Sequence, residues 1–116
     1  MPLFIVQITN KPGTKDARAD ALPDHHRYLR DRAGNVLIGG AILDESETGP
    51  TGSIYVIEAG SLNEARRFAD DDPLTHAGTR GEIVVCPWRT ALYDRRYVFG
   101  TAAAGDPIPG QAPPTT

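Results

Sequence analysis

The sequence is poor in the residues on which cross-linked and metal-held folds depend. Its 116 residues include one cysteine, one tryptophan and one methionine. A single cysteine excludes an internal disulfide and a zinc site made only from cysteines of one chain. No apolar run approaches the ~20 residues that a membrane-spanning helix needs. The 15 acidic side chains outnumber the 12 basic ones, which form no stripe, so a general nucleic-acid-binding surface is not expected.

The two ends of the chain differ in character. Residues 1–8 are apolar from the start and lack the basic segment and small-residue cleavage site of a signal peptide, so we interpret them as the first strand of a soluble cytoplasmic protein. Residues 100–116 contain four prolines and three glycines, and such a segment cannot bury enough surface to offset its ordering entropy. We therefore predict one folded domain over residues 1–99 and a flexible tail over residues 100–116. The alternative for this tail is that it docks on a partner subunit.

Strand-like composition recurs along the domain, in the segments 3–8, 36–43, 53–59 and 82–92. The first and the last of these segments are apolar at consecutive positions, which predicts strands with apolar residues on both faces. In the last strand we expect Ile83 and Val85 on one face, and Val84, Cys86 and Trp88 on the other. The second strand contains Gly39-Gly40, a feature that often marks a bulge or a close backbone approach.

Helical patterns occupy the segments 14–33 and 61–70. In the first, apolar spacing places Leu22, His25 and Leu29 on one stripe, and Pro23 favours a start or restart of the helix at that point. The second begins with a capping box, Ser61 to Glu64, and ends before Asp72-Pro73, with one more helical turn over residues 74–79.

This order of elements, β-α-β-β-α-β, predicts a ferredoxin-like α+β fold. Its antiparallel sheet carries both helices on one face. The other sheet face is then apolar and uncovered, and such a face indicates a partner surface. The simplest partner is a second copy whose sheet stacks face to face, which predicts a homodimer.

Two polar features suggest chemistry. His25 lies on the apolar stripe of the first helix, where an imidazole needs a partner; the alternative is a structural core histidine. Asp72 ends a run of three acids that opposes the dipole of a helix C-terminus, so we expect a compensating cation; the alternative is a solvated helix end. A carboxylate that orients a histidine is a common way to make a general base. Local sequence does not place the two side chains together.

Other chemistries have weaker support in the sequence. A metal site would have to combine His76 with the acidic run and the histidines of the first helix, but these residues lack a characteristic ligand spacing. Cys86 lies in the middle of a strand, so we expect an inert buried thiol. Ser53 lacks the G-x-S-x-G context of a hydrolase nucleophile, although its hydroxyl can bind a ligand. The Gly39-Gly40 pair lacks the spacing and the following helix of a phosphate loop.

Over residues 3–90 the sequence resembles the YciI-like (YCII-related) domain family. The resemblance rests on the segment His25 to Leu29 leading to Gly34, on Val36 to Ala41, on Ala69 to Leu74, and on Val85 to Trp88. It implies a ferredoxin-like fold that dimerises as a stacked-sheet barrel, a dimeric α+β barrel, with an active site at His25 and Asp72. A similar family member acts as a cofactor-independent dehydrochlorinase on a chlorinated hydroxyquinol, and relatives by fold include muconolactone isomerases. Ala41 departs from the family pattern, because a proline often follows the glycine pair.

Together these observations predict an enzyme of lyase or isomerase type that needs no metal, flavin or nucleotide cofactor. His25 acts as general acid/base and Asp72 orients it, while Ser53, Tyr55 and Gly40 bind a small, aromatic or lactone-like molecule. The alternative is a non-catalytic dimeric module that binds a small ligand or serves as an accessory subunit. Neither hypothesis includes a nucleic-acid or membrane partner.

Overall fold

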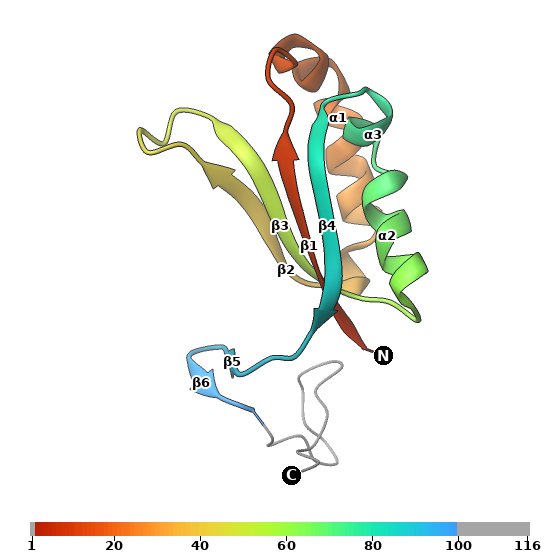
Figure 1. The fold of residues 1–116 in the computed structure, drawn as a ribbon, viewed down its shortest axis with the longest axis vertical. Coiled ribbons are helices and arrows are strands. Elements are labelled where there is room, and N and C mark those ends of the chain that lie inside the picture. The colour runs from red at the N-terminus through yellow and green to blue at the C-terminus, as the bar shows by residue number, and fades with distance from the viewer. Residues whose placement is uncertain (1, 100–116) are drawn as a thin grey trace.

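The computed structural model describes residues 2–99, so the predicted tail over residues 100–116 lies outside the described residues (Figure 1). The elements are β1 (Leu3–Asn10), α1 (Lys15–Asp31), a 3-10 turn (Ala33–Asn35), β2 (Val36–Leu43), β3 (Pro50–Glu58), α2 (Leu62–Asp70), α3 (Pro73–His76), β4 (Arg80–Trp88), β5 (Leu92–Tyr93) and β6 (Arg96–Tyr97). The predicted β-α-β-β-α-β order is confirmed, with α3 as the extra helical turn.

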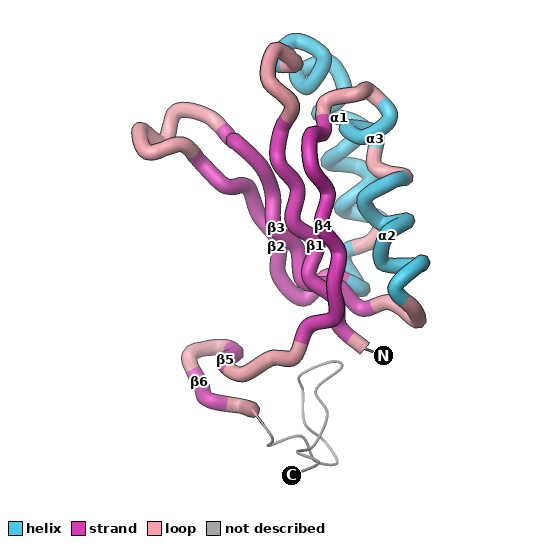
Figure 2. Tube along the Cα trace, viewed as in Figure 1, coloured by secondary structure: helices cyan, strands magenta, loops and turns pink. Residues whose placement is uncertain are grey.

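The main sheet has the strand order β2-β3-β1-β4, and all its neighbouring strands are antiparallel. Both long helices lie against one face of this sheet, which confirms the predicted two-layer arrangement (Figures 1 and 2). The short strands β5 and β6 form a separate hairpin below the sheet, joined by a turn with positive φ at Asp94 and Arg95. Positive φ at both central residues is the conformation of a tight two-residue hairpin turn.

The strand register decides which residues form the core. Val6 is paired with Tyr55 on one side and with Val85 on the other, so these three side chains share the face that the helices cover. The core cluster consists of Phe4, Val6, Ile8, Tyr28, Tyr55, Ile57, Ala59, Ala65, Phe68 and Ala69. Ile83 and Val85 pack against it, as the alternation in the last strand predicted.

The structure corrects three predicted element boundaries. The helix α1 does not restart at Pro23 but runs through it, because Pro23 and Ala19 are exposed and water can reach the carbonyl that loses its partner. The strand β3 begins at Pro50, which pairs with Leu43 across the hairpin, and not at Ser53. The strand β4 spans Arg80–Trp88 and not residues 82–92, and its last residue pairs with Leu3, the first residue of β1.

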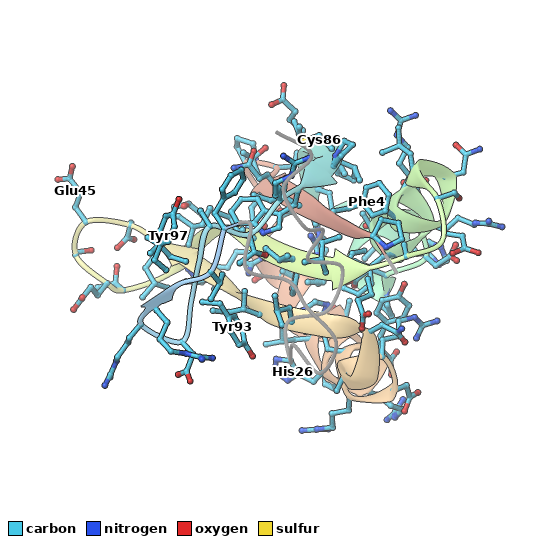
Figure 3. All side chains as sticks on the ribbon, turned by 90° about the horizontal axis from the view of Figure 1, so that it is seen from below. Phe4, His26, Glu45, Cys86, Tyr93 and Tyr97 are labelled. Carbon is cyan, nitrogen blue, oxygen red and sulfur yellow. The ribbon has the colours of Figure 1, made fainter. Side chains whose placement is uncertain are left out.

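The sheet face opposite the helices carries exposed apolar side chains. Ile38 is 67% exposed, Val84 39% and Trp88 38%. Cys86 lies on the same face of the edge strand β4 and is exposed, so the prediction of a buried thiol is wrong for this chain on its own (Figure 3). The mid-strand position did not reveal that no helix among residues 2–99 covers Cys86 on this face.

Within residues 2–99, no helix is both long enough and apolar enough to cross a membrane. The cytoplasmic location expected from the sequence stays a prediction.

Candidate active site

His25 projects from the middle of α1 toward the loop between α2 and α3. Its side chain is buried, and its Nδ1 atom lies 2.9 Å from Oδ1 and 2.8 Å from Oδ2 of Asp72. The two residues are 47 positions apart in the sequence, and both belong to one chain. The structure therefore brings together the two residues predicted for acid/base chemistry.

Asp72 reaches His25 because of the proline that follows it. Its backbone is extended, with φ −64° and ψ 134°, and it forms the N-cap of α3. The same carboxylate accepts a hydrogen bond from the backbone N–H of Leu74 at 2.8 Å. Asp70 and Asp71 stay exposed at the end of α2, whereas Asp72 is 1% exposed. The acidic run is thus divided between solvent and the interior.

Two residues that can carry positive charge, His25 and Arg80, contact Asp72 in the acidic run, and the sequence analysis did not identify Arg80. Arg80, the first residue of β4, donates from Nη2 to Oδ2 of Asp72 at 3.4 Å, and the side chains of both residues are 2% exposed. Its Nε and Nη1 atoms are buried and have no hydrogen-bond partner among the described residues. The sequence gave no indication of this contact, because Asp72 and Arg80 do not lie on one helix. Arg80 begins a strand that pairs with β1, and only this pairing brings it to Asp72.

The contact with Asp72 orients the imidazole of His25. An Nδ1–H that donates to a carboxylate leaves the lone pair of Nε2 free to take a proton. No hydrogen bond to Nε2 is present within residues 2–99. The imidazole ring of His25 also lines a pocket, so Nε2 can contact a molecule that binds there.

This pocket has a volume of about 330 Å³ and lies between α1 and the β2–β3 hairpin. Its walls include Arg18, Leu22, His25 and Leu29 from the helix, and Gly40, Ser53 and Tyr55 from the strands. All the residues predicted for substrate binding therefore line the same pocket as His25. Asp72 is absent from the pocket wall and contacts His25 from behind.

The packing of Tyr55 distinguishes the two glycines of the Gly39-Gly40 pair. The pKa of Tyr55 is raised because the side chain is buried, and hydrogen bonding to Ser53 and the charge of Arg80 counteract part of this effect. The Tyr55 ring lies directly over Gly39, where any added Cβ would overlap it. At Gly40 an added Cβ would meet open space. Gly39 is thus the glycine required for close packing, whereas Gly40 contributes to the pocket wall.

The structure of residues 2–99 contains no cluster of side chains that could bind a metal ion. Across residues 2–99, no three His, Cys, Asp or Glu side chains are grouped as ligands of one ion. His26 and His76 are both exposed, and neither contacts the buried carboxylate of Asp72 through its side chain.

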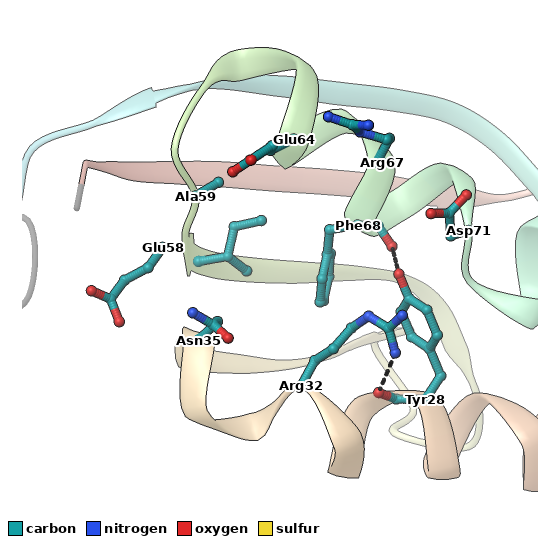
Figure 4. A pocket seen from close by; sticks show the side chains of 10 residues that line it. Tyr28, Arg32, Asn35, Glu58, Ala59, Glu64, Arg67, Phe68 and Asp71 are labelled. Carbon is teal, nitrogen blue, oxygen red and sulfur yellow. Dashed lines mark hydrogen bonds between the residues drawn. The ribbon is translucent and has the colours of Figure 1, made fainter.

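A second hollow of about 340 Å³ lies at the opposite end of the helix layer (Figure 4). There the Arg32 guanidinium stacks over the ring of Tyr28 at 3.6 Å, and the Tyr28 hydroxyl donates to the carbonyl of Phe68 at 2.7 Å. Glu64 accepts a hydrogen bond from the N–H of Gly60 as part of the cap of α2. These charged groups therefore have structural partners, and the hollow holds no acid/base pair like that of His25.

The chain is thus a small two-layer α+β protein with a buried His–Asp pair beside a pocket. It belongs to the family described as the YCII-related domain, whose family model matches residues 2–89. A solved structure of 5-chloro-2-hydroxyhydroquinone dehydrochlorinase (TftG) from Burkholderia phenoliruptrix AC1100, in complex with 2,5-dihydroxybenzoquinone, is similar. The TM-score is 0.68 at 30% sequence identity, over 74% of this chain and 92% of the other. A comparison with curated proteins found no match.

Proposed function

We propose that this protein is an enzyme that catalyses elimination or isomerisation of a small molecule, with His25 as the general acid/base. The observation that carries this proposal is the buried contact between His25 Nδ1 and the Asp72 carboxylate at 2.8 Å beside a pocket. The similar TftG structure is named as a dehydrochlorinase, which supports this reaction class. Aromatic and lactone-like molecules are of a size that such a pocket accepts.

The proposed chemistry uses the free Nε2 of His25. Nε2 takes a proton from the substrate, and the electron pair released forms a new π bond. In an elimination the leaving group departs with its own electron pair, whereas in an isomerisation the proton returns at another atom. Asp72 acts as a positioning residue, because it fixes the ring orientation and stabilises the imidazolium that forms. Neither route transfers electrons to an external acceptor.

The proposal is tested by turnover of 5-chloro-2-hydroxyhydroquinone and related halogenated hydroxyquinols, with release of halide as the readout. We expect His25→Ala to lower kcat by about 10²- to 10⁴-fold, the usual contribution of a general acid/base. His76→Ala is the matched control, because His76 is exposed and lies outside the pocket wall. Unchanged turnover in His25→Ala would refute the assignment. Binding of 2,5-dihydroxybenzoquinone without turnover of any compound in the series would favour the non-catalytic binding module.

For the open sheet face we infer that the occupant is a second copy of this chain. An exposed apolar surface at Ile38, Val84 and Trp88 loses contact with water when two such faces stack. Light scattering is expected to give about twice the 12.5 kDa chain mass. Val84→Glu should shift the protein toward the monomer, whereas Leu92→Glu should not, because Leu92 is 70% exposed but lies outside the main sheet. A monomeric wild-type protein would contradict the inference.

A further inference from the structure

The His25 pocket adjoins a wider hollow that carries a local excess of positive charge. This hollow has a volume of about 520 Å³ and shares Asn10, Arg18 and Pro50 with the pocket. Its charged lining residues are Lys11, Lys15, Arg18 and Asp44. Three cations against one acid form a surplus that is opposite in sign to the net charge of −3 of the whole chain.

The cations of this hollow have no acidic partners in the part of the chain that the structure describes. Within residues 2–99, none of Lys11, Lys15 and Arg18 forms an ion pair with a carboxylate. The carboxylate of Asp44 is held by its own loop, where Ser46 donates to it at 2.8 Å and the N–H of Thr48 donates at 3.0 Å. Hydrogen bonding from Ser46 and Thr48 also lowers the pKa of Asp44. Asp44 therefore makes its contacts within its own loop and forms no ion pair with Arg18 within residues 2–99.

Arg18 carries the more specific signal. Its Nε atom is buried and has no hydrogen-bond acceptor among the described residues. A buried donor without an acceptor is costly and rare in a folded protein, so such a group calls for an acceptor that arrives from outside. Arg18 lines both the hollow and the pocket, which places it where the two meet.

The start of α1 adds to the same field. The hydroxyl of its N-cap residue Thr14 donates to the carbonyl of Lys11 at 2.6 Å and does not cap the first N–H groups of this 17-residue helix. Thr14 and Lys15 line the hollow, so the positive end of the helix dipole lies there. Backbone and side chains thus favour an anion at one place.

The spacing along α1 relates this place to the reactive group. Arg18, Leu22 and His25 follow one another at intervals of four and three residues, so they lie on one face of the helix. Seven residues of helix separate Arg18 from His25 by roughly 10 Å along the axis. Leu22 lies between them as an apolar surface. The pocket wall formed by α1 therefore has a cationic guanidinium at one end, an apolar side chain in the middle and the imidazole of His25 at the other end.

We propose that the molecule bound in the His25 pocket carries an anionic oxygen group, a carboxylate or a phenolate, and that Arg18 binds this group. Lys11 and Lys15 attract the anion from solvent, since clustered charge raises the local concentration of an oppositely charged ligand. The guanidinium supplies charge-assisted hydrogen bonds to the oxygen. This proposal rests on the proposed function only in taking the pocket as the substrate site.

The test compares binding of benzoate with binding of benzamide, which has the same ring without the charge, by calorimetry or NMR titration. We expect wild-type protein to bind benzoate at least about tenfold more tightly, and Arg18→Gln to remove this preference. Arg18→Lys should keep part of it, because it retains the charge but loses the planar fork. Arg66→Gln is the matched control, because Arg66 is exposed on α2 and lies outside both hollows.

Two results would overturn the anion site. One is benzoate binding no tighter than benzamide binding in the wild type, and the other is unchanged benzoate affinity in Arg18→Gln. The His25→Ala variant separates this proposal from the proposed reaction, because it should still prefer benzoate while it loses turnover. If Arg18→Gln bound benzoate normally and His25→Ala were inactive, the anion site would be wrong and the reaction would stand.

Discussion

The charge balance around Asp72 leads to a quantitative prediction for Asp72→Asn. The wild-type carboxylate accepts from His25 Nδ1, from the N–H of Leu74 and from Arg80 Nη2. An asparagine can still cap α3 through its oxygen, since Asn and Asp are equivalent N-cap residues. Its NH2 group then occupies the place of Oδ2 and faces the donor of Arg80. The substitution therefore keeps the cap and removes the only carboxylate that pairs with Arg80 among the described residues.

The expected cost follows from the burial of that arginine. Removing one partner of a buried ion pair leaves an uncompensated charge and costs roughly 3–5 kcal/mol. We take about 3 kcal/mol, because the 3.4 Å contact is long and His25 can change its tautomer to accept from the new NH2 group. For a domain of this size, about 3 kcal/mol lowers the Tm by roughly 12–24 °C. The same tautomer change places a proton on Nε2, so turnover is also expected to fall.

The assay is urea unfolding of Asp72→Asn, Arg80→Met and the double variant, at one fixed protomer concentration because association would add stability. Replacing the orphaned arginine should return at least about half of the loss, because an apolar side chain leaves no buried charge. Asp24→Asn is the matched control, since its pair with Arg27 is exposed and is worth at most about 1 kcal/mol. A loss below about 1 kcal/mol in Asp72→Asn, or a double variant no more stable than the single one, would refute the reasoning.

Two further predictions concern packing and pH. Gly39→Ala should destabilise the fold and displace the Tyr55 ring in the pocket, because an added Cβ at this position overlaps the ring. Gly40→Ala should be tolerated, because an added Cβ there meets open space. Equal urea-unfolding midpoints of the two variants would contradict this prediction. Burial raises the pKa of Tyr28 from 10.0 to about 12, so the folded state keeps this proton to higher pH than the unfolded state. The free energy of unfolding should therefore fall as the pH rises from 10 toward 12. Tyr28→Phe should reduce this dependence on pH, whereas the control Tyr97→Phe should not, because Tyr97 is exposed. An unchanged pH dependence in Tyr28→Phe would contradict the prediction.

The features that the sequence predicted well are those that local periodicity and local hydrogen bonding control. The alternation in β4 correctly separated Ile83 from Val84, because side chains of a strand point to opposite faces whatever lies beyond it. Ser61 and Glu64 cap α2 as predicted, with Ser61 accepting from the N–H of Glu64. The extended backbone before Pro73 is also local, because the proline ring restricts the residue that precedes it.

Other features depended on the order and pairing of the strands, which local pattern does not contain. Asp72 meets His25 across 47 residues only because α1 and α3 pack side by side. Arg80 joins them because β4 pairs with β1, and Cys86 is exposed because it lies on the face of β4 opposite the helices. The packing of Tyr55 on Gly39 likewise follows from the register of β2 against β3. Period and propensity decide which face of an element a residue occupies, whereas contacts between distant segments arise only when those faces are packed together.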